Sequence, residues 1–337
     1  MDQEYNYMVA VRCYTFAHAK YIEDTLSGFI MQETTFPVMY LVVDDASKDG
    51  EQELLQKWAE SNLVSEDGGT LFREMPYGIL AEGLLRGNSN IAFKIILLSE
   101  NHYSKHLPKK NYISEYMDAA KYIAVCEGDD YWISSNKLQK QVDFMECNCD
   151  YTLCFHSVFE KYEGRSNLNK VRAIVEDREY SGLEWYKDRP SQFASFLFRS
   201  WIEKDPYYTK IENNRRFIAR DVPLLLSCAH LGKIRGMSDV MSVYRHNETG
   251  WTQNVRSKNE IIRIIDSQLE YGVFGKEFER LAISYYNREC VKAFIYSFKG
   301  KPDFSFIPIS WKKSKMGTII AFVSVIVSIV KSKIRVL

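Results

Sequence analysis

The stretch VMYLVVDDAS, residues 38–47, sets the fold class of this chain. Its apolar run from Val38 to Val43 is continuous rather than alternating, and it stops abruptly at Asp44 and Asp45. Strands with continuous apolar runs are buried on both faces, which is typical of parallel sheets covered by helices. The stretch therefore predicts a central strand of an α/β domain, with two carboxylates at its carboxyl end.

The flanking segments alternate between strand and helix patterns. Residues 17–31 repeat their apolar side chains with the period of an amphipathic helix, and residues 52–60 predict a second helix. Further strands are expected at residues 8–16, 93–99 and 121–127, and residues 61–92 look like a polar insertion. Ligands of such open parallel sheets gather at the carboxyl ends of the strands.

A second acidic cluster lies in the sequence YIAVCEGDDYW, residues 122–132. Glu127, Asp129 and Asp130 crowd around Gly128 directly after an apolar strand. Neighbouring carboxylates are ligands for hard cations, and Mg²⁺ usually binds through one or two carboxylates plus substrate phosphates. A solvated acidic turn is the alternative. Because neighbouring parallel strands present their carboxyl ends at one edge, both acid clusters are expected to face one crevice.

Composition excludes some classes of partner. The 337 residues include 44 basic and 44 acidic side chains, so overall charge does not attract the chain to nucleic acid. The seven cysteines are odd in number and no secretory signal precedes them, which favours reduced thiols and a cytoplasmic protein. Cys147, Cys149 and Cys154 could form a zinc corner, but no second pair has ligand spacing.

The second half of the chain is less regular. Residues 151–159 and 191–199 predict strands, and residues 222–232 predict a helix that ends at Gly232. Residues 257–297 predict two helices without a sheet partner.

The C-terminal residues 311–337 predict a membrane-associating tail. Residues 316–330 carry no charge, and they are flanked by Lys312, Lys313, Lys315, Lys331, Lys333 and Arg335. As a helix the uncharged run is roughly 22 Å long, which is shorter than the roughly 30 Å hydrocarbon core of a bilayer. It suits a shallow, in-plane anchor on anionic lipid headgroups. A buried core helix and a true membrane span are the alternatives.

Glycine-rich phosphate-binding motifs are absent from the sequence. Neither G-x-G-x-x-G nor G-x-x-x-x-G-K-[ST] occurs, and GILAEGLL at residues 78–85 has the glycine spacing without the lysine. A phosphate ligand would therefore be held by a metal ion and scattered donors. An acid pair for a nucleoside and an acidic loop for a metal ion fit a nucleotide-sugar site.

Four stretches carry a family resemblance: YTFAHAKYIEDTLSGFIMQ (14–32), VVDDASKDG (42–50), KYIAVCEGDDYWISSNKLQKQVDFME (121–146) and RDVPLLLSCAHLGKIRGMSDVMSVYRHNETGW (220–251). In this order they resemble glycosyltransferase family 2, over roughly residues 7–252. The resemblance implies a GT-A fold, with a Rossmann-like, mostly parallel central sheet flanked by helices. Residues 1–135 would be the nucleotide-sugar-binding half and 136–252 the acceptor half, followed by a helical extension at 253–310 and the tail.

The resemblance also implies roles for individual residues. The residues expected to bind the nucleotide-sugar are Thr15, Asp44, Asp45, Asp129 and Asp130. The residues expected to hold Mn²⁺ or Mg²⁺ are Glu127, Asp129 and His246. Asp221 would be the general base that deprotonates the acceptor hydroxyl, and a helix cap is its structural alternative. Trp132, His156 and Trp251 could line the acceptor pocket, with core packing as the alternative for Trp132 and His156.

Three positions depart from the family pattern. Ala17 stands where the family usually has Asn, Glu127 replaces the first Asp of the metal motif, and Arg220 precedes Asp221 where Glu or Gly is common. These departures bear on the donor contacts, the metal site and the base, respectively.

The implied activity is an inverting, metal-dependent transfer of a sugar from a nucleotide-sugar, a UDP-sugar by resemblance, to a hydroxyl of a glycan or lipid-linked acceptor. Such a hexosyltransferase would serve bacterial cell-surface polysaccharide assembly at the inner face of the cell membrane. One alternative is a nucleotidyltransferase, but CYTFAHAKY lacks that class's glycine-rich first loop. The other is an inactive scaffold, and the argument against it is that four acids are retained together: Asp45, Asp129, Asp130 and Asp221. No pattern in the sequence specifies an oligomeric state.

Overall fold

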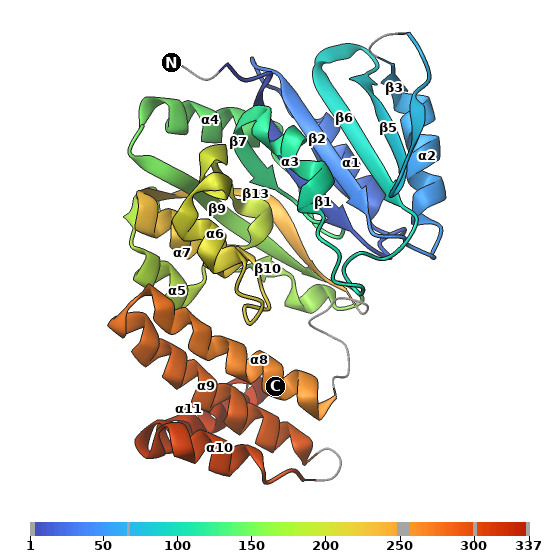
Figure 1. Cartoon of the computed structure of the whole chain (residues 1–337). Helices are drawn as coiled ribbons and strands as arrows, with labels where there is room; N and C mark the ends of the chain where they lie inside the picture. Colours follow the sequence, from blue (N-terminus) through green and yellow to red (C-terminus); the bar gives the residue numbers. More distant parts are fainter. Residues whose placement is uncertain (1–3, 66–67, 248–256, 299–301, 335–337) are drawn as a thin grey trace. The chain divides into compact units, whose positions relative to one another are not determined.

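The computed structural model describes residues 4–65, 68–247, 257–298 and 302–334 (Figure 1). The chain forms two compact units. The first contains Met1–Tyr208 and Ser227–Gln253, and the second contains Thr209–Leu226 and Asn254–Leu337. A large mixed sheet with helices forms the first unit, and helices dominate the second.

The centre of the sheet is parallel. Its strands run in the order β7 (Ala120–Val125), β1 (Tyr7–Thr15), β2 (Val38–Asp44) and β6 (Asn88–Leu98). Every residue of β2 is buried, which confirms the burial on both faces that its continuous apolar run predicts. Thr15 of β1 pairs with Asp44 of β2, so these two residues mark the same carboxyl edge of the sheet.

Four helices follow the central strands in the chain. They are α1 (Ile22–Ile30), α2 (Glu51–Asn62), α3 (Lys110–Asp118) and α4 (Lys137–Cys147). Helix α1 buries Ile22, Leu26 and Phe29, which is the face that the apolar period predicts. The ring of Phe29 stacks on Tyr40 of β2 with centroids 4.7 Å apart, so the helix is fixed to the middle of the sheet.

The expected polar insertion at residues 61–92 is wrong, because this segment extends the sheet. Strand β5 (Gly78–Leu85) pairs antiparallel with β6, and it also pairs with β3 (Leu63–Val64) and β4 (Phe72–Met75). Leu80 and Ala81 of β5 are buried, while charged residues of β4 stay exposed. The apolar residues within the polar stretch therefore suffice to cover this edge.

The opposite half of the sheet is mixed. Its strands are β8 (Tyr131–Trp132), β9 (Tyr151–Tyr162), β10 (Lys170–Val171), β11 (Glu179–Tyr180), β12 (Leu197–Arg199) and β13 (Lys233–His246). Of the strand expected at 191–199 only β12 forms, because Phe193–Ser195 make a 3₁₀ turn closed by the Ser195 N–H on the Gln192 carbonyl. Strand β8, just after the acidic loop, pairs with β13. Helices α5 (Gly182–Asp188), α6 (Pro206–Glu212) and α7 (Asp221–Leu231) complete this half of the chain.

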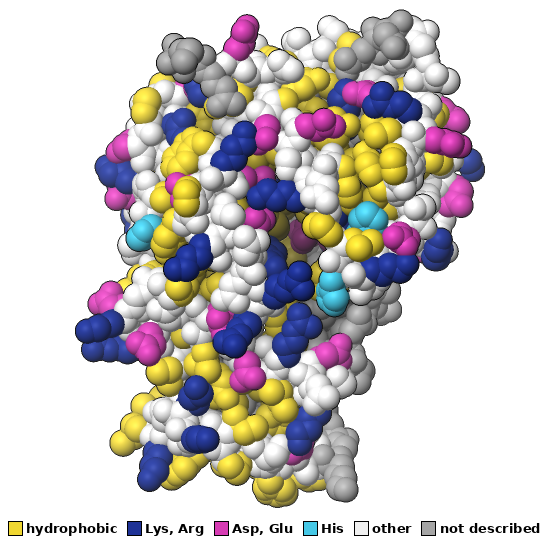
Figure 2. Space-filling view, viewed as in Figure 1, with side chains coloured by type: hydrophobic (Ala, Val, Ile, Leu, Met, Phe, Trp, Pro, Cys, Tyr) yellow, Lys and Arg dark blue, Asp and Glu magenta, His cyan; other side chains and the backbone are white. Residues whose placement is uncertain are grey.

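The second unit contains α8 (Lys258–Ser267), the 3₁₀ segment η4 (Gln268–Phe274), α9 (Lys276–Ser297), α10 (Phe306–Lys313) and α11 (Lys315–Ile334). The two helices expected within residues 257–297 are confirmed. Ala321 and Val325 of α11 pack against Val291 of α9. Among the described residues, no helix combines the length and apolar character needed to cross a bilayer. On the face shown in Figure 2, acidic and basic side chains are interspersed.

Candidate functional site

The loop after β7 gathers three carboxylates. Oxygen atoms of Glu127, Asp129 and Asp130 all lie within 4.8 Å of one another. Glu127 is exposed, Asp129 is partly buried, and Asp130 is only 2% exposed. A set of oxygen donors at this spacing fits a hard divalent cation such as Mg²⁺ or Mn²⁺.

The backbone of this loop is fixed from two sides. The hydroxyl of Thr25 in α1 donates to the carbonyl oxygens of Gly128, at 3.0 Å, and Asp130, at 2.6 Å. The Gly128 N–H donates to the Tyr14 carbonyl of β1 at 3.0 Å. The carboxylates therefore project from a rigid turn, which lowers the entropic cost of holding a ligand.

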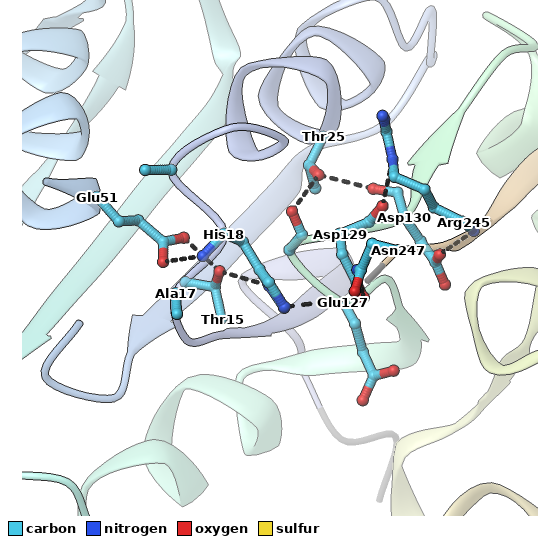
Figure 3. Close-up of polar contacts among 12 residues, drawn as sticks. Thr15, Ala17, His18, Thr25, Glu51, Glu127, Asp129, Asp130, Arg245 and Asn247 are labelled. Carbon is cyan, nitrogen blue, oxygen red and sulfur yellow. Dashed lines mark hydrogen bonds and ion pairs between the residues drawn. The ribbon is translucent and has the colours of Figure 1, made fainter. Parts of the chain in front are cut away.

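Arg245 of β13 clamps the same loop. Its backbone N–H donates to Asp130 Oδ1 and its Nε donates to the Asp129 carbonyl, both at 2.9 Å (Figure 3). Its guanidinium also pairs with Glu163 at 2.8 Å and with Asp24 at 2.6 Å. Arg245 is thus engaged within the protein, where it holds the loop and neutralises carboxylates around it.

Burial and the neighbouring charge of Asp129 hold the pKa of Asp130 well above its ordinary value. Asp130 is also the most buried of the three carboxyls and is held by the Arg245 N–H, whereas Glu127 and Asp129 are the more accessible oxygen donors of the cluster.

The loop after β1 faces the acidic loop. The Thr15 hydroxyl donates to Glu51 of α2, and its oxygen lies 3.1 Å from Nδ1 of His18. The N–H of Ala17 donates to Ser47 Oγ and that of His18 to Glu51 Oε2, each at 2.9 Å. Ala17 has φ of 58°, a left-handed conformation that Asn adopts more readily than Ala. The loop keeps the backbone that the usual Asn would favour.

His18 reaches across to Asp129. Its Nε2 lies 3.7 Å from Asp129 Oδ2, and Figure 3 shows the ring pointing from the first loop toward the carboxylates. The Asn247 side-chain amide donates to the same Oδ2 at 2.9 Å. Burial lowers the pKa of His18, which favours the neutral imidazole, whereas burial raises the pKa of Glu51 to about 7.

The acid pair after β2 is buried and hydrogen-bonded. Asp44 Oδ1 accepts from the Ser47 N–H at 3.0 Å and from Gln52 Nε2 at 2.6 Å. Asp45 accepts from the N–H groups of His102 and Tyr103, at 2.8 and 3.0 Å, and from Lys109 Nζ at 2.9 Å. The pair therefore organises the loops at the ends of β2 and β6.

Both acid clusters lie beside the end of β1. The Asp45 N–H donates to the Thr15 carbonyl at 3.0 Å. Gly128 packs so closely on Thr15 that an added Cβ would lie 2.1 Å from the Thr15 hydroxyl oxygen. Thr15 thus connects the loop carrying Asp45 to the loop carrying Asp129, as the common edge of parallel strands predicts.

Other expected site residues lie elsewhere. The His246 ring stacks on Tyr162 with centroids 4.0 Å apart, and its Nε2 lies 3.4 Å from Glu160 Oε1. Trp132 is 1% exposed and donates to the Ala194 carbonyl at 3.0 Å. His156 is fully buried, with Nδ1 2.8 Å from the Ser157 carbonyl oxygen. This burial favours core packing for Trp132 and His156.

Two further expected residues cannot be grouped with the cluster. Asp221 is the first residue of α7 and belongs to the second unit, so its role as a base stays a prediction. Trp251 lies outside the described residues. Residues that sequence reasoning missed are His18, Glu51 and Asn247. The only sequence signal for His18 is its position three residues after Thr15 in the first loop.

Comparisons with known proteins come from sequence and structure. No family model matches the chain. Uncharacterised proteins of Mycobacterium bovis (Mb1547) and Mycobacterium tuberculosis (Rv1520) are each 28% identical over 238 residues, which covers 68% of this chain and 56% of each relative. The chain therefore spans about half the length of these relatives.

Solved structures of TarS from S. aureus share the fold. TarS 1–349 in complex with UDP-GlcNAc matches with a TM-score of 0.55 and 15% identity, over 90% of this chain and 79% of that chain. The complex with UDP also has a TM-score of 0.55, with 13% identity, over 93% and 88% of the two chains. The chain thus shares the α/β fold of TarS, and the large central sheet flanked by helices and followed by C-terminal helices confirms the architecture that the sequence predicts.

Proposed function

We propose that this chain is an inverting, metal-dependent glycosyltransferase that moves a sugar from a nucleotide-sugar, preferentially a UDP-sugar, to a hydroxyl of a glycan or lipid-linked acceptor. The observation that carries the proposal is the group of Glu127, Asp129 and Asp130 at the carboxyl end of β7, beside the loops after β1 and β2. The likeness to TarS, whose structures contain UDP and UDP-GlcNAc, supports the donor class.

Each residue of the cluster has a defined part in this proposal. Glu127 and Asp129 hold the cation, and Asp130, bonded to the Arg245 N–H, keeps the loop in place. A bound Mn²⁺ or Mg²⁺ would neutralise the charge that develops on the departing diphosphate. Asp221 takes the proton from the attacking acceptor hydroxyl, so that one displacement inverts the anomeric centre.

Isothermal titration calorimetry tests the proposal by measuring how tightly UDP-sugars bind. The wild type and Asp129→Asn are each titrated once in the presence of MnCl₂ and once in the presence of a chelator. We expect tight binding only with Mn²⁺ and only in the wild type. Asp143→Asn, at an exposed position on α4, is the matched control and should bind as the wild type does. If neither the chelator nor Asp129→Asn changed the affinity for UDP-sugars, the proposal of a metal-dependent transferase would be refuted. Binding without turnover on any acceptor would favour the scaffold, and sugar-nucleotide synthesis would favour the nucleotidyltransferase.

We further propose that this transferase works at the cytoplasmic face of a membrane, held there by α11. One side of the helix packs on α9, but Ile320 and Val323 on the other side are 59% and 60% exposed. Met316, Ile319, Ile326 and Val327 are exposed too. Residues 304–337 contain six Lys or Arg and no Asp or Glu, in a chain of zero net charge. An apolar face with cations at both ends complements an anionic bilayer, whereas two copies would repel each other.

Vesicle flotation tests this placement with the full chain. We expect it to float with phosphatidylglycerol vesicles and to remain unbound with phosphatidylcholine vesicles. Val323→Asp together with Ile320→Asp should abolish flotation, while Ser324→Asp tests whether an added charge alone matters. A double variant that still floats would contradict the proposal. If the chain instead dimerises in solution through this face, the partner of the face is a second copy of the chain and not a bilayer.

A further inference from the structure

We propose that His18 is a ligand of the divalent cation and that its nitrogen makes the site prefer Mn²⁺ to Mg²⁺. This inference deepens the proposed function, because it rests on the cation bound by Glu127 and Asp129. His18 lies outside the acidic motif, in the loop after β1, and it faces the motif across the carboxyl edge of the sheet (Figure 3).

The hydrogen bonds of Thr15 decide which nitrogen of His18 carries the proton. The Thr15 hydroxyl has one proton, and it donates that proton to the Glu51 carboxylate. Toward His18 Nδ1, 3.1 Å away, the Thr15 oxygen can therefore only accept. Nδ1 carries the proton, and the lone pair of the neutral ring is on Nε2, which faces Asp129. A histidine that ligates a metal is usually held this way, with its other ring nitrogen donating to a fixed acceptor.

The separation between His18 and Asp129 fits two ligands of one ion. Nε2 lies 3.7 Å from Asp129 Oδ2, which is too long for a direct hydrogen bond. Ligand atoms about 2.1 Å from an octahedral ion are roughly 3.0 Å apart when adjacent and roughly 4.2 Å apart when opposite. The observed distance lies between these two values, so a cation between the atoms needs only a small adjustment of either side chain.

The first loop holds His18 ready for this role. Its N–H donates to Glu51 Oε2, and the preceding Ala17 N–H donates to Ser47 Oγ, both at 2.9 Å. Ser47 in turn donates to Glu51 Oε2 at 2.9 Å. The backbone and one ring nitrogen of His18 are therefore both tied to the buried Glu51, and only Nε2 is directed at the acidic loop.

The ligand set has a consequence for the identity of the ion. Carboxylates and water suit Mg²⁺ and Mn²⁺ alike, whereas imidazole nitrogen suits transition metals. Adding one nitrogen to two carboxylates therefore strengthens Mn²⁺ binding and does little for Mg²⁺. His246 is the competing histidine of the sequence, but its ring stacks on Tyr162 and its Nε2 lies beside Glu160.

The experiment measures Mn²⁺ binding to the full chain at pH 8, by electron paramagnetic resonance titration with MnCl₂ alone and then with UDP. Pulsed resonance detects nitrogen bound to the Mn²⁺. The wild type should show coupling to one histidine nitrogen. His18→Ala should lose that coupling and bind Mn²⁺ at least about tenfold more weakly, with Mg²⁺ affinity from competition nearly unchanged. His246→Ala should keep both the coupling and the affinity.

Thr15 provides a second pair of variants. Thr15→Ser keeps the hydroxyl and should bind Mn²⁺ like the wild type, whereas Thr15→Val removes the acceptor for Nδ1–H and should weaken Mn²⁺ binding. Thermal melts establish that each variant is folded. Coupling that is absent from the wild type, that survives in His18→Ala, or that disappears in His246→Ala overturns the proposal. If any of these results is found and Mn²⁺ still supports UDP binding, the proposed function is retained and only the role of His18 as a ligand is refuted. Nitrogen coupling without sugar transfer would instead leave the His18 site standing and refute the function.

Discussion

The substitution Gly128→Ala adds one methyl group at the contact between the acidic loop and the loop after β1, and it should push these two loops apart. An added Cβ would lie 2.1 Å from the Thr15 hydroxyl oxygen and 2.5 Å from Thr15 Cβ, against an ordinary contact of about 3.5 Å. The Thr15 side chain cannot rotate away freely, because its hydroxyl is bonded to Glu51. Gly128→Ala must therefore move the acidic loop or the first loop by about 1 Å.

Overpacking of this kind costs about 1–3 kcal/mol. For a unit of this size the melting temperature should fall by roughly 2–10 °C, and Mn²⁺ affinity should fall with it. Differential scanning calorimetry measures the first, and resonance titration the second. Gly272→Ala is the control, because its added Cβ would meet Glu279 at an ordinary 3.4 Å.

A double-mutant cycle isolates the clash. Thr15→Gly removes the two nearest atoms that the new methyl group would meet and leaves His18 Nδ1, at 3.2 Å. Gly128→Ala should therefore cost about 1 kcal/mol less in that background than in the wild type. A Gly128→Ala protein that melts and binds Mn²⁺ as the wild type does would refute the close packing. A cost that is unchanged by Thr15→Gly would refute Thr15 as its cause.

Three further predictions concern other parts of the structure. Ala17→Gly should raise stability by about 1 kcal/mol in thermal melts, because Ala17 has φ of 58°; a lower melting temperature would contradict this. Burial raises the pKa of Glu51 from 4.5 to about 7, so its contribution to stability is complete below pH 4.5 and is lost as pH rises through 7. Melts of Glu51→Gln across this range should lack that loss, and an unchanged pH slope would count against it. Asp221→Asn should lower turnover by about 10²–10⁴-fold with donor binding intact in calorimetry, and full activity would remove Asp221 from catalysis.

The sequence predicts the parallel centre of the sheet because its signals there are local. The unbroken apolar run of β2 and the acids that end β2 and β7 are visible without tertiary information. At the edge of the sheet the signal is weaker, because the eight residues of β5 stand between polar stretches of the chain and find their partner only in β6. Strand β12 is shorter than the apolar stretch that predicts it, because the residues before it form a 3₁₀ turn. The backbone hydrogen bonds of this turn are made within the turn and not with a neighbouring strand.

The candidate site divides in the same way. The acidic loop can be located from the sequence, because its three carboxylates directly follow a continuous apolar strand. The place of His18 in the site cannot be predicted from the sequence, because it depends on the positions of Thr15, Glu51 and Asp129 around the His18 ring in the folded chain. Arg245 could equally have met a phosphate or a carboxylate; only the fold places Glu163 and Asp24 beside it.

The Arg245 clamp has a consequence for how the protein is synthesised. Arg245 is 115 residues away in the chain from Asp130, the carboxylate that its N–H holds. On a ribosome, β7 and its acidic loop emerge well before β13 exists, so the loop lacks this clamp until β13 has been synthesised. Closure of long chain segments is slow and comes late in folding. The acidic loop is therefore fully clamped only after β13 has been made and has paired, and a fragment ending before β13 should order this loop poorly even if its central sheet is formed.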